Sequence, residues 1–453
     1  MKNTLIESEK QTSSSVAEDL TKRLAVFLEP LLVRMDTTVD KRLVRTLLRL
    51  VGVILEFRHS RHGLLLSELG AYLLSPEHAP AGTKRISNLL RSKKWSHQIV
   101  ERFLWWRADN QLCELEAEGR DVLALWDESV LEKPESIALE GLCAVRSSRA
   151  ARLKRIKPGF YNPPGGPPVF VPGMQWLGLL LVGYAGAPVL AAMRWWTTRG
   201  PNASDKRTEE LSLLRECARA WGQRVLHVFD RGFAGSPWLG ELIPRRLRFI
   251  LRWPKSYRLR DQSGRVRKAW EIVRGQRSWG HRQLWDARRQ CWRKTGIIAV
   301  PVYHPDYPDY PLWLVVSRPG AGREPWYLLT NQPIATQPDA WQMVFAYARR
   351  WQIEMAWRYS KTELAMESPR LWKWNNRLKL LLIVALAYAF LLTLLDPTLT
   401  DLCQWLLRHW CHRTGKRSQN SLTPLYRLRS AISRLWLAHP PPFPTFPFAE
   451  NSG

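Results

Sequence analysis

The chain has 453 residues, of which 45% are hydrophobic and 24% are charged, and this composition excludes an intrinsically disordered protein. Lys and Arg outnumber Asp and Glu by 68 to 40, so the formal net charge is +28. Such a charge predicts a polyanionic partner, with nucleic acid as the first candidate and an anionic membrane surface as the second.

The length predicts two to four domains, at roughly 100–200 residues per domain. Six cysteines without a paired framework favour a reducing compartment, and the first residues lack the apolar segment of a secretory signal. The longest apolar run, residues 380–395, is shorter than the ~20 residues that span a bilayer, so we expect a buried helix there. Together these features predict a cytoplasmic protein with no membrane partner.

Residues 1–118 carry apolar side chains at three- and four-residue spacing, which predicts a helical region. Within this region, 64–74 and 83–92 form a predicted helix pair that is interrupted at Pro76 and Pro80. The second helix would expose a polar, mostly basic face made of Lys84, Arg85, Asn88 and Arg91. We expect this face to bind DNA, although a solvated basic helix would show the same pattern.

From residue 119 onwards, short apolar runs predict strands, at 122–126, 176–183, 189–196 and 225–229. A helical pattern at 208–221 precedes the last of these runs. Strand, two strands, helix and strand is the start of a mixed α/β sheet, which we place in residues 119–244.

Residues 245–333 are predicted to form a basic, β-rich insertion. The first 50 of them contain 17 Lys or Arg and three acidic residues, a net charge of +14. Tryptophans are interleaved with these cations, at Trp253, Trp270, Trp279, Trp285 and Trp292. Helical patterns return in 334–397, which we assign to the second part of the α/β core. Residues 398–453 would form a helical C-terminal region with a Pro-rich tail.

One predicted helix contains Tyr347, Arg350, Glu354 and Lys361. At about 100° per residue, these four side chains fall within about 60° of one helix face, beside an apolar stripe that would pack on a sheet. A solvated face with an Arg350–Glu354 pair would explain the helix by itself.

Two aspartates make a catalytic interpretation stronger. Asp127 and Asp230 each close an apolar strand, where a carboxylate is costly unless a cation or donor meets it. Adjacent strand ends would place them side by side, and Glu354 would complete a set of oxygen ligands for hard divalent ions. Two such ions can activate an attacking oxygen and stabilise the leaving one. Glu128 competes with Asp127 as the ligand, but strand alternation places Asp127 on the face of Leu123 and Leu125.

The spacing Tyr347-x2-Arg350-x3-Glu354-x6-Lys361 resembles the Y-(2)-R-(3)-E-(6)-K signature of bacterial insertion-sequence DDE transposases. Asp230-Arg231-Gly232-Phe233 resembles the motif around the second catalytic aspartate of that family, and Asp127 resembles the first. The resemblance covers roughly residues 119–365.

The resemblance implies an α/β fold: an RNase H-like mixed-sheet core with a β-rich insertion, flanked by helical N- and C-terminal regions. It also implies that Asp127, Asp230 and Glu354 hold two Mg²⁺, which Mn²⁺ would replace. Water would nick the transposon end, and the freed 3′-hydroxyl would attack target DNA. A homodimer would hold the two ends in the cytoplasm, associated with the nucleoid.

The same resemblance assigns DNA contacts. Tyr347 and Arg350 would bind phosphates near the scissile bond, Lys361 would hold the terminal nucleotides, and Arg231 would lie beside them. Some relatives stack a flipped base on a tryptophan of the insertion, for which Trp279, Trp285 and Trp292 are candidates. For any single one of the three, a position in the core or in the wall of a phosphate groove is the favoured interpretation. Phosphate contacts by the insertion, including Arg288 and Arg289, would make binding depend on salt.

Other functional classes fit the sequence less well. None of the histidines has Arg three residues later, as a tyrosine recombinase needs, and no Gly-x4-Gly-Lys-Ser/Thr phosphate loop occurs. Cys403, His409, Cys411 and His412 lack the spacing of a zinc site. Two alternatives stay open: a catalytically silent DNA-binding descendant, and an RNase H-like nuclease without strand transfer.

Overall fold

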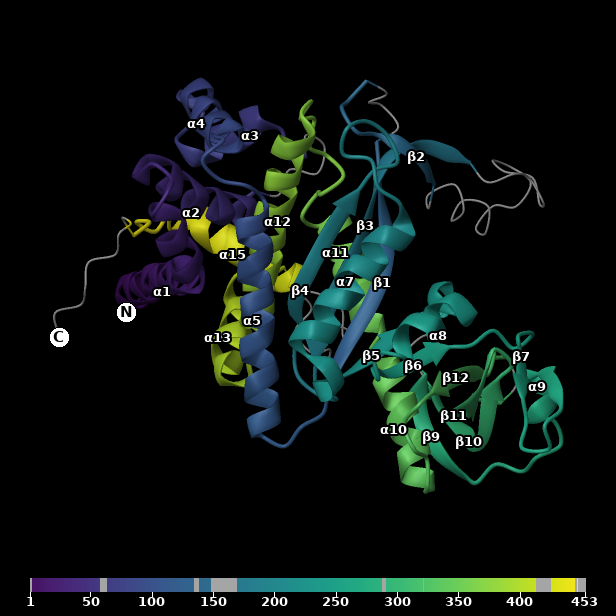
Figure 1. The fold of residues 1–453 in the computed structure, drawn as a ribbon. Helices are drawn as coiled ribbons and strands as arrows, with labels where there is room; N and C mark the ends of the chain where they lie inside the picture. Colours follow the sequence, from purple (N-terminus) through teal and green to yellow (C-terminus); the bar gives the residue numbers. More distant parts are fainter. Residues whose placement is uncertain are drawn as a thin grey trace.

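The computed structural model describes residues 2–57, 63–133, 138–147, 169–286, 291–320, 322–412, 425–444 and 446. Figure 1 shows an α/β molecule in which a helical body lies beside a long twisted sheet. The helical body is built from both ends of the chain, because the N-terminal helices pack against the last ones.

The N-terminal region consists of helices α1 (Lys2–Asp36), α2 (Lys41–Glu56), α3 (Leu66–Leu73), α4 (Ala79–Arg91) and α5 (Gln98–Ala117). Helix α2 begins after Asp40, whose carboxylate accepts a hydrogen bond from the backbone N–H of Arg42. Helices α3 and α4 form the predicted pair, and they approach closely because Gly70 faces Gly82. A Cβ at Gly82 would overlap the backbone of Gly70.

The central sheet contains strands β1 (Val122–Glu132), β3 (Phe170–Val182), β4 (Val189–Trp196), β5 (Val225–Phe229) and β6 (Arg248–Arg252). Their spatial order is β4-β3-β1-β5-β6. Strands β4, β3 and β1 are antiparallel to one another, whereas β1, β5 and β6 run parallel. This order confirms the predicted RNase H-like mixed sheet. Strand β2 (Cys143–Arg146) pairs with the first residues of β3.

Side chains alternate across this sheet, so each face of β1 contributes to a different core. Leu123 and Leu125 belong to the core shared with the helical body, whereas Ala124 and Trp126 belong to a second core. The second core includes residues of α7 (Lys206–Ala220) and α8 (Ser236–Leu242). Short 3₁₀ helices at Gly222–Arg224 (η1) and Arg231–Phe233 (η2) flank β5.

The basic insertion extends the central sheet instead of forming a separate one. Strand β12 (Trp326–Thr330) pairs antiparallel with β6, and β11 (Tyr307–Arg318) and β10 (Cys291–His304) follow. Four smaller elements complete it: β7 (Arg258–Arg260), β8 (Val266–Lys268), α9 (Ala269–Ile272) and β9 (Gly280–Asp286). Although β6 lies within the range predicted for the insertion, its parallel pairing with β5 makes it a strand of the core.

The last part contains α10 (Gln337–Ala348), α11 (Trp351–Thr362), α12 (Trp374–Thr393), η3 (Pro397–Leu399), α13 (Thr400–His409) and α15 (Leu425–Ala438). Helix α12 is long and apolar enough to cross a membrane, but 89% of its most apolar window is buried inside the protein. It contacts α2 and α5 of the N-terminal region and also β4 (Figure 1). We therefore interpret α12 as the central helix of the core.

Candidate active site

Asp127 lies in the middle of β1, not at its end. The strand continues to Glu132 because residues 127–132 keep pairing with β3, and Asp127 lies opposite Gly178. The expectation that Asp127 closes its strand is therefore wrong. Asp127 shares the face of Leu123 and Leu125, as strand alternation predicts. The pKa of its carboxyl is raised to about 7, chiefly by burial and to a smaller extent by Glu354 and Asp230, while Arg350 acts to lower it.

Asp230 follows directly after β5 and occupies the N-cap position of η2. Strands β1 and β5 pair Leu125 with Val228, and this parallel register, continued by two residues, brings Asp230 beside Asp127. The hydroxyl of Tyr347 donates a hydrogen bond to Oδ1 of Asp230 at 3.1 Å. Burial raises the pKa of Tyr347 to about 12, so this side chain remains a donor at neutral pH.

The predicted single helix is two helices. Helix α10 ends at Ala348 and α11 begins at Trp351. At the junction the backbone N–H groups of Arg350 and Ile353 bond to carbonyls three residues earlier, so a tight 3₁₀-like turn replaces the continuous α-helix. The turn places Tyr347 on one helix and Glu354 on the next, with Arg350 between them.

Arg350 connects the acidic residues of this site. Its side chain is only 8% exposed, and its guanidinium forms an ion pair with Glu354. The guanidinium Nε lies 3.9 Å from Oδ1 of Asp230. Burial acts to lower the pKa of Arg350. Its neighbours Tyr347, Asp230 and Glu354 outweigh burial and hold that pKa above its ordinary value. A permanently charged group therefore lies among the three carboxylates.

Helix α11 is fixed against the sheet by an aromatic contact. The ring of Trp357 lies 4.7 Å from that of Trp176 on β3, and it packs on Gly178 in the same strand. A Cβ at Gly178 would overlap the Trp357 ring, so glycine is required at this close approach. Because Asp127 pairs with Gly178 in the sheet, this contact holds α11, which carries Glu354, against the strand next to Asp127.

Lys361 lies at the far end of α11 from Arg350. Its Nζ donates a hydrogen bond of 2.7 Å to Oγ of Ser129, which follows Asp127 by two positions on the same strand face. The ammonium also lies 5.7 Å from the centre of the Trp176 ring. Ser129 was not among the predicted site residues, although its place in the alternation with Asp127 was a usable signal.

Glu128 points away from this site. Its Oε2 lies 2.8 Å from Nζ of Lys206 on α7, on the opposite face of the sheet from α11. Burial, together with a hydrogen bond to Glu128, raises the pKa of Glu210 to about 8. Glu128 and Glu210 thus form one acidic pair around Lys206, separate from Asp127.

The oxygen atoms of these carboxylates are suitable ligands for a hard divalent ion, but their present arrangement does not form a metal site. Three carboxylate side chains from β1, the end of β5 and α11 supply oxygen donors, and their mutual repulsion is what a cation would relieve. Among the described residues, however, no group of three or more His, Cys, Asp or Glu side chains is placed to hold a metal ion. Arg350 is the cation that compensates them in this structure.

The predicted DNA contacts have different environments. Trp279, Trp285 and Trp292 are 43%, 48% and 66% exposed, so the core interpretation is wrong for all three. Trp285 and Trp292 pair across β9 and β10 with ring centres 5.5 Å apart. Arg231 is exposed on η2, and Lys84, Arg85 and Arg91 are exposed on α4. Arg288 and Arg289 lie outside the described residues.

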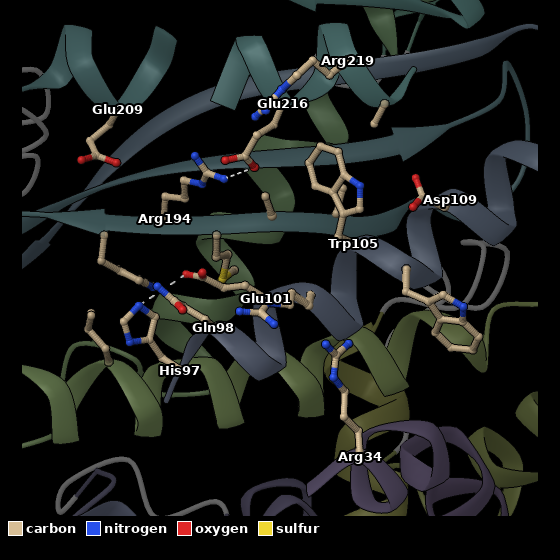
Figure 2. A pocket seen from close by; sticks show the side chains of 18 residues that line it. Arg34, His97, Gln98, Glu101, Trp105, Asp109, Arg194, Glu209, Glu216 and Arg219 are labelled. Atoms are coloured by element: carbon tan, nitrogen blue, oxygen red, sulfur yellow. Dashed lines mark hydrogen bonds and ion pairs between the residues drawn. The ribbon is translucent and has the colours of Figure 1, made fainter. Parts of the chain in front are cut away.

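The cavity in Figure 2, of about 900 Å³, is distinct from the carboxylate site. It lies between α5, β4 and α7, and its charged side chains largely compensate one another. Arg194 forms an ion pair with Glu216, and the His97 ring lies 4.0 Å from the Glu101 carboxylate. Burial raises the pKa of Glu101 to about 7. None of Asp127, Asp230 and Glu354 lines this cavity.

Comparison with known proteins gives one family match. Residues 192–390 match the family described as "Transposase DDE domain", a range that contains Asp230 and Glu354 and begins after Asp127. No curated protein matches the chain. Among solved structures, a piggyBac transposase synaptic complex with hairpin DNA is similar at a TM-score of 0.40 and 11% identity. That similarity covers 94% of this chain and 79% of the other.

Proposed function

We propose that this chain is the DNA transposase of a bacterial insertion sequence. The observation that carries the proposal is the link from Tyr347 and Arg350 to Asp230 and Glu354, beside Asp127 on the neighbouring strand. The tyrosine and arginine of the four-residue signature, Tyr347 and Arg350, would position the acidic residues that they contact. The match of residues 192–390 to a transposase domain supports the same conclusion.

The reaction would be hydrolysis of a phosphodiester bond at the transposon end, followed by attack of the freed 3′-hydroxyl on target DNA. Asp127, Asp230 and Glu354 would hold two Mg²⁺, or Mn²⁺ in their place, which would activate the attacking oxygen and stabilise the leaving one. Tyr347 would orient Asp230 through its hydrogen bond. Arg350 would exchange its carboxylate partners for a DNA phosphate, a ligand that guanidinium binds bidentately.

The remaining assignments concern the partner and its location. Lys361, which bonds to Ser129 two positions past Asp127 on β1, would hold the terminal nucleotides of the transposon end. The exposed pair Trp285 and Trp292 fits base stacking better than a core role. Two chains would act as a homodimer on two ends, in the bacterial cytoplasm and in association with the nucleoid.

A cleavage assay tests the proposal. DNA carrying the ends that flank this gene would be incubated with Mg²⁺ or Mn²⁺ and either the wild type or Asp127→Asn, Asp230→Asn or Glu354→Gln. The proposal expects cleavage with a 3′-hydroxyl product, lost in all three variants while DNA binding is kept. Glu128→Gln is the matched control, because Glu128 lies on the opposite sheet face, and it should cleave as the wild type does.

The same assay separates the alternatives. Binding of the ends without cleavage under either ion would identify a catalytically silent descendant. Cleavage without joining of the 3′-hydroxyl to a target plasmid would identify an RNase H-like nuclease.

A further inference from the structure

A second cavity, of about 870 Å³, lies between helices α2 and α4 in the N-terminal region. One side is closed by the C-terminal segment, by which we mean the described residues after α15, including Phe443 and Pro444. Figure 1 shows this yellow segment beside α2. We call it the arginine pocket, because its charged lining consists of four arginines and one acid: Arg42, Arg45, Arg49, Arg85 and Asp40. Neither the carboxylate site nor the cavity of Figure 2 shares a residue with it.

Three of the arginines form one face of α2. Arg42, Arg45 and Arg49 are separated by three and four residues, a spacing that places them within about 60° of one another around the helix. Helix α4 contributes Arg85 and Asn88, which are spaced three apart and exposed. Two helix faces therefore direct guanidinium groups into one concave space.

These cations have no acidic partner among the residues that the structure describes. Within the described part of the chain, no Asp or Glu lies within 4.0 Å of the guanidinium groups of the four arginines. Asp40 serves the backbone instead, as the N-cap of α2. Burial lowers the pKa of Arg49, and the more distant Glu56 offsets this only in part. Arg49 is therefore partly desolvated, whereas Arg42, Arg45 and Arg85 are exposed at the mouth of the pocket. An external anion would relieve the mutual repulsion of these four cations.

The C-terminal segment holds two of the arginines in place. The guanidinium of Arg49 lies 4.1 Å from the centre of the Phe443 ring, and Nε of Arg45 donates to the carbonyl of Phe446 at 2.9 Å. The Phe443 ring packs on Gly52 of α2, where a Cβ would overlap it. The remaining N–H groups of these guanidiniums stay available for a ligand in the pocket.

We propose that the arginine pocket binds backbone phosphates of duplex DNA, and that the C-terminal segment orients its arginines for this purpose. The inference rests on the proposed function, since it gives a DNA-acting enzyme a second grip outside the catalytic core. Arginine binds phosphate bidentately, and phosphate contacts position a protein on a duplex without reading its sequence. The basic face of α4 continues this grip past the pocket through Lys84 and Arg91.

The test measures how salt weakens binding of the full-length protein to a 30-base-pair duplex of arbitrary sequence, by fluorescence anisotropy. Replacing Arg42, Arg45 and Arg85 together by Ala should reduce the slope of log K against log salt by roughly 2 to 3, at about 0.9 per lost phosphate contact. The matched control replaces Lys22, Arg215 and Arg408, exposed cations on α1, α7 and α13, and should keep the wild-type slope. An unchanged slope in the pocket variant, or an equal change in the control, would overturn the proposal.

Two further variants distinguish a loss of phosphate contacts from a loss of the folded structure. Replacing the same three arginines by Lys keeps the charge, so the slope should stay near that of the wild type while affinity falls severalfold with the bidentate geometry. Phe443→Ala removes no charge and should also lower affinity severalfold at a nearly constant slope. Tighter binding by Phe443→Ala would overturn the assigned role of the C-terminal segment, because it would show that the segment blocks the pocket.

The outcome is independent of cleavage. If the pocket variant changes the slope but the wild type cleaves no DNA, the phosphate-binding role of the pocket stands and the transposase function is wrong. If the wild type cleaves DNA but the slope is unchanged in the pocket variant, the transposase function stands and the role of the pocket is wrong.

Discussion

The Tyr347 hydroxyl donates its hydrogen bond to the carboxylate of Asp230 across two different elements, from the end of α10 to the end of β5. The tyrosine ring is buried, and it packs edge-on against Trp326 at 5.1 Å between ring centres. The insertion strand β12 carries Trp326, so the insertion helps to fix the tyrosine that bonds to the Asp230 carboxylate. This contact couples the basic part of the sheet to the acidic site.

Tyr347→Phe tests this positioning role. The ring and its packing on Trp326 would remain, while Asp230 would lose one donor. A hydrogen bond to a charged group contributes about 1.5–3 kcal/mol, so we expect roughly a tenfold or greater loss in the single-turnover cleavage rate. Tyr327→Phe, at another buried tyrosine in β12, is the control and should leave the rate unchanged. Equal rates for Tyr347→Phe and the wild type would remove Tyr347 from the site.

Gly178→Ala tests how α11 is seated. The added methyl group would overlap the Trp357 ring, which is buried against Trp176 and cannot swing into solvent. Overpacking of this kind costs about 1–3 kcal/mol, so the free energy of unfolding in urea should fall by that amount. The rate of DNA cleavage should fall by more than the decrease in the folded fraction accounts for, because Glu354 would be displaced together with α11.

Gly232→Ala is the matched control for Gly178→Ala, because a Cβ at Gly232 meets nothing within 4 Å. Its unfolding free energy should stay close to that of the wild type. A Gly178→Ala protein as stable as this control would show that α11 adjusts freely on the sheet.

The buried His227 predicts how stability depends on pH. Trp126 Nε1 donates to His227 Nδ1 at 3.0 Å, so the ring is held neutral in β5. Burial lowers the pKa of His227 to about 3, whereas an unfolded histidine titrates near 6.5. Because the unfolded state takes up the proton first, stability contributed by the neutral ring is complete above pH ~6.5 and is lost as pH falls towards 3.

Urea unfolding at pH 7, 6, 5 and 4 measures this loss, which should approach about 1.4 kcal/mol per pH unit below pH ~6. His227→Gln keeps an acceptor for Trp126 but cannot titrate, so its stability should vary less over the same range. His412→Gln, at an exposed position, should keep the wild-type slope. Identical slopes for His227→Gln and the wild type would mean that other groups govern acid unfolding.

Part of the site could be predicted from the sequence because it depends on local rules. Alternation along β1 places Asp127 on the α11 face and Glu128 on the α7 face, and the structure shows both. Apolar runs also located β5 and the start of β1. The continuation of β1 past Asp127 was not predictable, because its partly exposed polar residues resemble a loop until β3 pairs with them.

The break between α10 and α11 has no local signal either. Neither Pro nor Gly occurs at 349–350, and the helical pattern continues through both residues. The turn coincides with tertiary contacts that periodicity does not encode: Arg350 is buried between Asp230 and Glu354. Likewise, the apolar run of β6 could not reveal that its neighbour is β5 of the core. In both cases tertiary contacts decided the outcome: side-chain ion pairs at Arg350, and backbone strand pairing at β6.

Gly52→Ala tests the contact between the two ends of the chain. Alanine in the middle of a helix usually stabilises by about 0.5–1 kcal/mol relative to glycine. Here the methyl group would overlap the Phe443 ring, so we expect a loss of stability and faster proteolysis of the C-terminal segment. Adding Phe443→Ala to Gly52→Ala removes the overlap, and the double variant should recover part of the loss that Gly52→Ala causes alone. A double-mutant cycle in urea measures this coupling, and strictly additive effects would show that Phe443 does not pack on α2 in solution.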